Sequence, residues 1–177
     1  MKTLLAKLLP GFGGRRFRSH AIAAFEFLTR ELGFSEGVFQ SDFFGDTLTY
    51  SRSDVAVKVS LDKRDRYLEV YVIRLRDGQI PLYVEEPQDW IPLSNLLATR
   101  GLEPLPSARE THSASDDLPN ALIAAASALR QHGRDALAGN PSIFAEIARR
   151  YPQPRRRRED YVTREVPPGS TGTGTAS

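Results

Sequence analysis

The fold of this chain is decided by a stretch of alternating residues at positions 47–78, which reads TLTYSRSDVAVKVSLDKRDRYLEVYVIRLRDG. Apolar side chains recur at every second position in two parts of it, at Leu48 and Tyr50 and again from Val55 to Val59. Such alternation is typical of half-buried β-strands, because successive side chains point to opposite faces. Residues 66–76 are apolar on both faces, which predicts a central strand.

The turns between these segments are short, which indicates an antiparallel arrangement. Residues 51–54 and 62–65 are polar turns, and the pair Asp77-Gly78 is typical of a hairpin. Residues 79–84 are expected to return as a short strand, and Pro81 places that strand at a sheet edge. The sequence therefore predicts an antiparallel meander of about four strands.

Helical patterns lie on both sides of the strands. Ser19 is a suitable N-cap for a helix over 20–32, and Gly33 is a suitable left-handed residue at its end. The apolar stripe of this helix is formed by Ile22, Phe25, Leu28 and Leu32. Three further helices are expected from Pro92 to about Gly101, from about 116 to 131, and over 141–150. The predicted fold class is α+β, with the N-terminal and C-terminal helices packed on one face of the sheet.

The chain is expected to hold one domain, at 19–150, between two basic ends. Residues 1–18 are predicted to form a short helix over 2–9 and a glycine-rich hinge over 11–14. Residues 151–177 are rich in arginine and then in proline, glycine, serine and threonine, so they are predicted to be disordered in isolation. The sequence has neither a signal-peptide pattern nor an apolar run long enough to span a membrane, which predicts a cytoplasmic protein with no membrane contact.

The net charge of +2 conceals a division of charge along the chain. Residues 1–25 carry +5, residues 26–148 carry −7 and residues 149–177 carry +4. An acidic domain opposes direct binding of nucleic acid and is compatible with a basic protein partner. Arginine makes up 20 of the 24 basic residues, and together with abundant alanine this suggests a bacterium of high GC content.

Composition excludes several kinds of chemistry. The absence of cysteine excludes disulfides, zinc–thiolate sites, iron–sulfur clusters and thiol nucleophiles. The three histidines are not at ligand spacing, and the neighbours Ser19 and His20 do not face each other on a helix. Paired acids at 116–117 suit a helix start better than a catalytic site. We therefore expect no catalytic residues, no metal, no cofactor and no enzymatic activity.

One acidic segment is a candidate for partner binding. Glu85, Glu86 and Asp89 surround a proline and lead to Trp90, the single tryptophan of the chain. Tryptophan is enriched at interface hot spots, and an acidic loop with an aromatic anchor suits a basic partner. The alternative, which the usual burial of large aromatic residues favours, is that Trp90 and Ile91 fill the core while the acids are solvated.

Two further features bear on nucleic acids. Tyr67, Tyr71 and the pair Phe43-Phe44 are aromatic residues of the kind that stack on bases, but Glu69 lies between the two tyrosines and opposes phosphate. The densest positive charge is the run of Arg155, Arg156, Arg157 and Arg158. Such a run suits binding of nucleic acid or another polyanion, contact with an acidic protein, folding back onto the acidic domain, or a merely solvated tail, and these alternatives remain open.

Three parts of the chain carry a resemblance to known proteins. They are FEFL followed by ELGF at 25–34, the LTY strand at 48–50 ahead of a valine strand, and LAGNPSIF at 137–144. Together, over about 20–150, they resemble small uncharacterised α+β proteins of high-GC bacteria, some of which are immunity proteins that block a cognate toxin. The resemblance implies non-enzymatic protein binding, and it assigns no functional residue. The alternative function is a nucleic-acid-associated protein that acts through its arginine-rich ends.

Overall fold

The computed structural model describes residues 12–65, 67–83, 85–103 and 118–152. The helix expected at 2–9, the paired acids at 116–117 and the tail from 153 onward, with its run of arginines, lie outside these residues. Among the described residues, no helix combines the length and the apolar character needed to cross a membrane.

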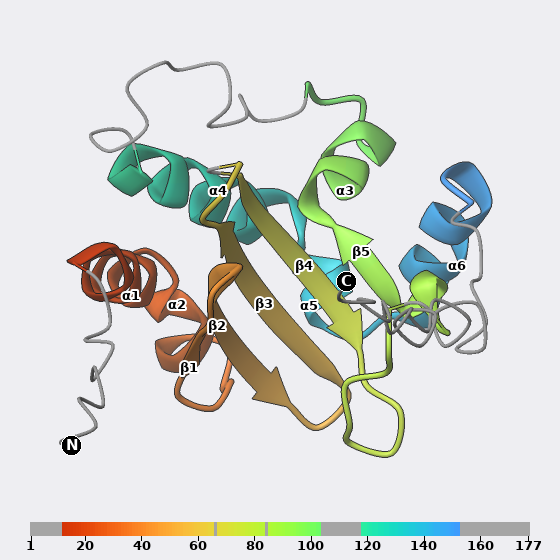
Figure 1. Ribbon diagram of the computed structural model, residues 1–177. Helices are drawn as coiled ribbons and strands as arrows, with labels where there is room; N and C mark the ends of the chain where they lie inside the picture. The colour runs from red at the N-terminus through yellow and green to blue at the C-terminus, as the bar shows by residue number, and fades with distance from the viewer. Residues whose placement is uncertain (1–11, 66, 84, 104–117, 153–177) are drawn as a thin grey trace, which may run out of the picture.

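The described residues form an α+β fold around one antiparallel sheet, in the order β1-β2-β3-β4-β5 (Figure 1). Its strands are β1 (Val38–Ser41), β2 (Gly45–Arg52), β3 (Val55–Asp62), β4 (Leu68–Arg74) and β5 (Trp90–Pro92). The sheet is a meander, because each strand pairs with the next one along the chain.

The sheet has five strands rather than about four, and the differences lie at its edges. Residues 79–84 were expected to form the last strand, but the described residues 79–83 form only an isolated bridge, between Gln79 and Arg76. The edge position belongs instead to β5, whose three residues pair with Tyr71, Val72 and Ile73. Both β1 and β5 are too short to show alternation, so the sequence pattern does not reveal them.

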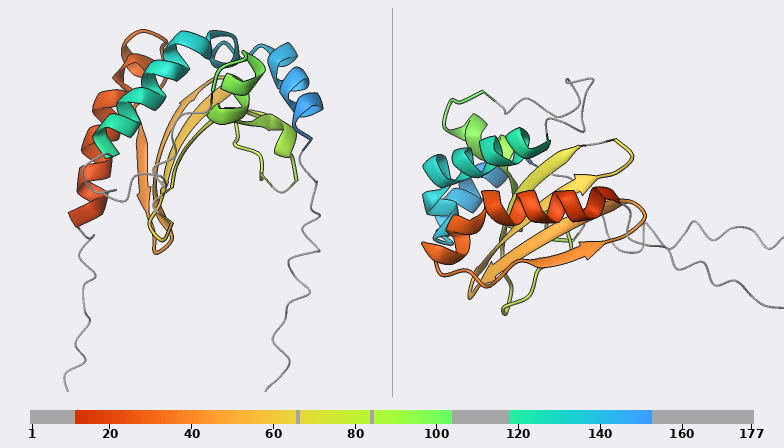
Figure 2. Two further views of the ribbon diagram at one scale, coloured as in Figure 1. Left: turned by 90° about the horizontal axis from the view of Figure 1, so that it is seen from above. Right: turned by 90° about the vertical axis from the view of Figure 1, so that its left-hand side faces the viewer.

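The strand register places the expected apolar residues in rows on one face of the sheet. Leu48 lies opposite Val59, which lies opposite Val70. Because side chains alternate along each strand, every second residue of these strands joins this face. The helices form an arch over it, and the other face carries no helix of the described part of the chain (Figure 2).

The N-terminal helical region differs from the prediction. It consists of α1 (Phe12–Ala24) and α2 (Glu26–Arg30), and Ser19 is not an N-cap, because it lies inside α1 with its Oγ 3.0 Å from the Arg16 carbonyl oxygen. The helix starts within the glycine segment that was expected to be a hinge, where Gly14 is buried beside the Asp46 carboxylate. An anionic group beside a helix N-terminus is electrostatically favourable.

The break between α1 and α2 also changes which residues are buried. Ile22 was expected in the apolar stripe, but 41% of it is exposed, whereas Phe17 is fully buried. Gly33 has a φ of 70°, as expected for the residue that ends this helical region.

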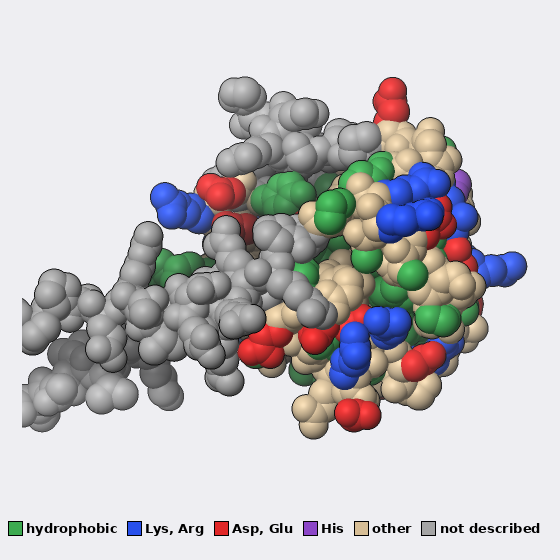
Figure 3. All heavy atoms as spheres, turned by 90° about the vertical axis from the view of Figure 1, so that its right-hand side faces the viewer, with side chains coloured by type: hydrophobic (Ala, Val, Ile, Leu, Met, Phe, Trp, Pro, Cys, Tyr) green, Lys and Arg blue, Asp and Glu red, His purple; other side chains and the backbone are tan. Residues whose placement is uncertain are grey.

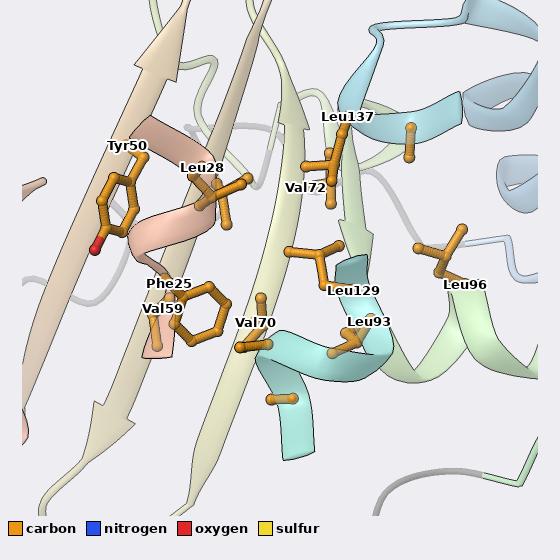
Figure 4. Close-up of a cluster of buried hydrophobic side chains, with 14 of the residues drawn as sticks. Phe25, Leu28, Tyr50, Val59, Val70, Val72, Leu93, Leu96, Leu129 and Leu137 are labelled. Atoms are coloured by element: carbon orange, nitrogen blue, oxygen red, sulfur yellow. The ribbon is translucent and has the colours of Figure 1, made fainter. Parts of the chain in front are cut away.

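The three expected C-terminal helices are present, and a fourth short helix, α5 (Arg134–Leu137), which was not expected, lies between the last two. The expected helices are α3 (Leu93–Thr99), α4 (Leu118–His132) and α6 (Pro141–Arg150), and the short 3-10 helix η1 (Pro87–Asp89) precedes β5. Asn140 caps α6 through its side chain, which accepts a 3.0 Å hydrogen bond from the Ser142 amide. Side chains from these helices meet the sheet in one core, where Leu129 and Leu137 lie near Val70 and Val72 (Figure 4).

Candidate protein-interaction surface

The face of the sheet that carries no described helix holds a cluster of aromatic and charged side chains. Lys58 of β3 lies opposite Tyr71 of β4, and Ile73 of β4 lies opposite Trp90 of β5. Ile73 is fully buried even though its face has no helix over it. Trp90 is its direct neighbour across the strand pair.

Three aromatic rings form the centre of this surface. The ring centroid of Trp90 lies 5.5 Å from those of Tyr71 and Tyr83, and the two tyrosine rings are 6.3 Å apart. The rings meet edge to face, which is a favoured geometry for aromatic pairs. We call Tyr71, Tyr83 and Trp90 the aromatic cluster.

Polar contacts hold the aromatic cluster in place. The indole Nε1 of Trp90 donates a 3.0 Å hydrogen bond to the carbonyl oxygen of Pro81, which ties the segment after β4 to the sheet. The Nζ atom of Lys58 lies 5.5 Å from the centroid of the indole ring, within cation–π distance. These contacts fix the positions of the rings, and a surface that is already ordered loses less entropy on association than a mobile one.

Burial controls the acid–base state of the cluster. Desolvation raises the pKa of Glu69, although its hydrogen bond with Tyr71 acts in the opposite direction. Burial and then the hydrogen bond with Glu69 raise the pKa of Tyr71, and burial also raises the pKa of Tyr83. Both phenols therefore stay protonated at neutral pH and supply hydrogen-bond donors rather than negative charge.

The structure separates the acids of the proposed binding segment, and Asp89 requires a correction. Its side chain is fully buried, so it cannot contact a partner directly. Arg74 Nε donates to Oδ1 at 2.8 Å and Arg76 Nε donates to Oδ2 at 2.6 Å. Asp89 and Trp90 are adjacent, and only the tryptophan joins the aromatic cluster. Asp89 instead joins the end of β4 to η1.

The other two acids differ in exposure. Glu86 is half-buried, lies 3.7 Å from Arg76 and accepts a hydrogen bond from Gln88. Glu85 is exposed and makes no ion pair within the described residues. Trp90 is itself half-buried, whereas Ile91 is 1% exposed in the core. Ile91 therefore fills the core, as one hypothesis for this segment expects, whereas Trp90 faces the open side of the sheet.

Apolar side chains continue the surface along the segment between β4 and β5. Ile80, Leu82 and Tyr83 are 41%, 50% and 38% exposed. Seen from the side of β5 and α6, the molecule shows apolar side chains among side chains of both charges (Figure 3). Contiguous exposed apolar residues with a polar rim are a mark of interaction sites.

The remaining candidate residues lie elsewhere or do not assemble a site. Phe43 and Phe44 are 90% and 74% exposed in the turn between β1 and β2, and so they are not on the sheet face with Tyr71. His20 is an exposed residue of α1. Within the described residues, no group of three or more His, Cys, Asp or Glu side chains is arranged to hold a metal ion.

Sequence reasoning missed Lys58 and Tyr83 as members of the surface. Lys58 reads as an ordinary polar residue of an alternating strand, and its place opposite Tyr71 follows only from the register. Tyr83 was assigned to a strand that does not form. No protein-family model matches this chain, and neither the curated proteins nor the solved structures gave a match.

Proposed function

We propose that this chain is a non-enzymatic protein-binding module of the immunity type, which occludes a basic surface on its partner. The observation that carries the proposal is the aromatic cluster, which the open face of the sheet presents in a fixed arrangement. Tryptophan and tyrosine dominate interface hot spots, because they bury a large area at little entropic cost.

The surroundings of the cluster support a basic partner. Glu85 and Asp77 are exposed at the two ends of the segment between β4 and η1, without an ion pair among the described residues. Acids at the rim of an apolar patch accelerate association with a cationic partner and disfavour anionic ones. Lys58 keeps its full positive charge beside the indole ring, so it offsets one of these two acids and leaves the other.

The test begins with purification of the tagged chain from a nuclease-treated lysate of its native host. The protein retained in stoichiometric amount is then titrated against a surface variant with Ile80→Ser, Leu82→Ser and Glu85→Lys. These side chains are exposed, so the variant is expected to fold normally. We expect its affinity to fall by about 10-fold or more, the loss associated with removing one hot-spot contact.

A matched control carries the same chemical changes away from this surface. It combines Ile22→Ser, Ile123→Ser and Glu36→Lys, at two exposed apolar residues and one exposed acid. We expect the control to bind as the unaltered chain does. Equal affinities for the two variants would refute the placement of the site. Capture that disappears after nuclease treatment would favour the nucleic-acid alternative and contradict the proposed function.

A further inference from the structure

The last described residues lie beside the aromatic cluster. Tyr151 and Pro152, which follow α6, line a hollow of about 190 Å³ together with Pro87 and Trp90. Trp90 thus borders both the hollow and the open sheet face. The chain beyond Pro152 begins at the edge of the candidate surface.

The run of arginines is close enough to reach this surface. Arg155 is three residues beyond Pro152 and Arg158 is six residues beyond it. An extended chain advances about 3.3–3.6 Å per residue, so these positions can lie up to about 10 Å and about 20 Å from Pro152. Trp90 lines the same hollow as Pro152, and its ring centroid lies 5.5 Å from those of Tyr71 and Tyr83, so a segment of this length can reach the cluster.

The chemistry of the surface matches that of the run. Guanidinium groups stack on aromatic faces and form paired hydrogen bonds with carboxylates. The segment from β4 to η1 carries two more negative than positive charges, from Arg74, Arg76, Asp77, Glu85, Glu86 and Asp89. Tyr83 and Glu85 are the exposed aromatic and acidic members of this region. An arginine-rich segment complements both features at once.

We propose that the sheet face around the aromatic cluster binds an arginine-rich segment, and that in the free protein this segment is Arg155–Arg158 of the same chain. A short tether gives such a segment an effective concentration of about 1 mM, so even weak contacts fill the surface. An external partner must displace the segment and must offer similar basic chemistry. This last consequence rests on the proposed function, whereas occupancy by the chain's own segment does not.

Trp90 provides a direct test, because it is the single tryptophan of the full chain. We would measure quenching of its fluorescence by acrylamide, a neutral quencher, in the full-length protein. Replacing all four arginines from Arg155 to Arg158 by glutamate is expected to raise the quenching constant about twofold at low salt. Raising NaCl to about 1 M, where the Debye length is about 3 Å, is expected to give the same rise in the unaltered chain and no further rise in the variant.

A control with an equal change of net charge replaces Lys2, Lys7, Arg15 and Arg16 by glutamate. This control is expected to keep the low quenching constant of the unaltered chain. A second variant changes the charge on the other side of the contact. Glu85→Lys alone should raise the quenching constant of Trp90, because it repels the arginines. Combining Glu85→Lys with glutamate in place of the four arginines should lower the quenching constant again, because the two sides then have opposite charges. Circular dichroism confirms that each variant is folded.

The proposal is overturned if the variant with glutamate at 155–158 is quenched like the unaltered chain at low salt. It is also overturned if the N-terminal control changes equally, since the effect would then follow net charge. The measurement needs no partner, so failure here leaves the proposed function standing. Loss of the proposed function in the binding experiment would likewise leave this contact intact.

Discussion

Replacing Asp89 by asparagine tests a buried ionic contact of the fold. The substitution keeps the shape of the side chain but removes its charge and turns one oxygen into a donor group. Asp89 is fully buried and accepts hydrogen bonds from Arg74 and Arg76. The altered side chain would then place an amide against guanidinium donors, which leaves at least one buried donor unpaired.

The size of the effect follows from the exposure of the partners. Removing one member of a fully buried ion pair costs about 3–5 kcal/mol, because an uncompensated charge remains. The side chains of Arg74 and Arg76 are 31% and 52% exposed, so water compensates part of the loss. We therefore expect the free energy of unfolding to fall by about 2–3 kcal/mol, which lowers Tm by about 5–10 °C for a chain of this size.

Urea unfolding and thermal melting measure this loss. The matched control is Glu85→Gln, the same change of carboxylate to amide at an exposed site, which is expected to stay within about 0.5 kcal/mol of the unaltered protein. Because the Asp89 contact is buried, the difference between the two variants should persist at high salt. A loss below about 0.5 kcal/mol for Asp89→Asn, or a difference that vanishes in high salt, would refute this account of Asp89.

Four further outcomes are expected. Tyr50→Phe should raise the free energy of unfolding by about 1 kcal/mol in urea, because the buried hydroxyl finds no hydrogen-bond partner among the described residues. Burial raises the pKa of Tyr50 from 10.0 to about 12, so the folded state favours the protonated phenol over the phenolate. The stability linked to this proton is fully present below pH 10 and is lost as the pH rises towards 12. The free energy of unfolding should therefore fall less steeply with rising pH for Tyr50→Phe than for the unaltered protein. Phe43→Ser with Phe44→Ser should leave Tm within about 2 °C, since both rings are exposed, and a large drop would show that they pack against the fold. Gly45→Ala should cost about 1–3 kcal/mol in urea, because its Cβ would lie 2.7 Å from the Leu61 carbonyl oxygen; an unchanged midpoint would contradict this.

Much of the candidate surface was not predictable from the sequence. The charges and the tryptophan at 85–90 indicate a candidate binding segment, but a sequence pattern does not distinguish a buried acid from a solvated one. Asp89 is buried because two arginines from the end of β4 reach it across 13 to 15 residues of sequence. Local composition does not encode such pairings, and the register that brings Lys58 to Tyr71 is equally non-local.

Elements with local signals could be predicted from the amino-acid sequence alone. Alternation at Leu48 and from Val55 to Val59 indicates two central strands, and Gly33 indicates a helix end, because each of these signals acts through the backbone within a few residues. Three features could not be predicted in this way: the edge strands, the start of α1 within the glycine segment, and the assembly of the aromatic cluster. These depend on strand pairing and on contacts between distant segments, where packing outweighs local propensity.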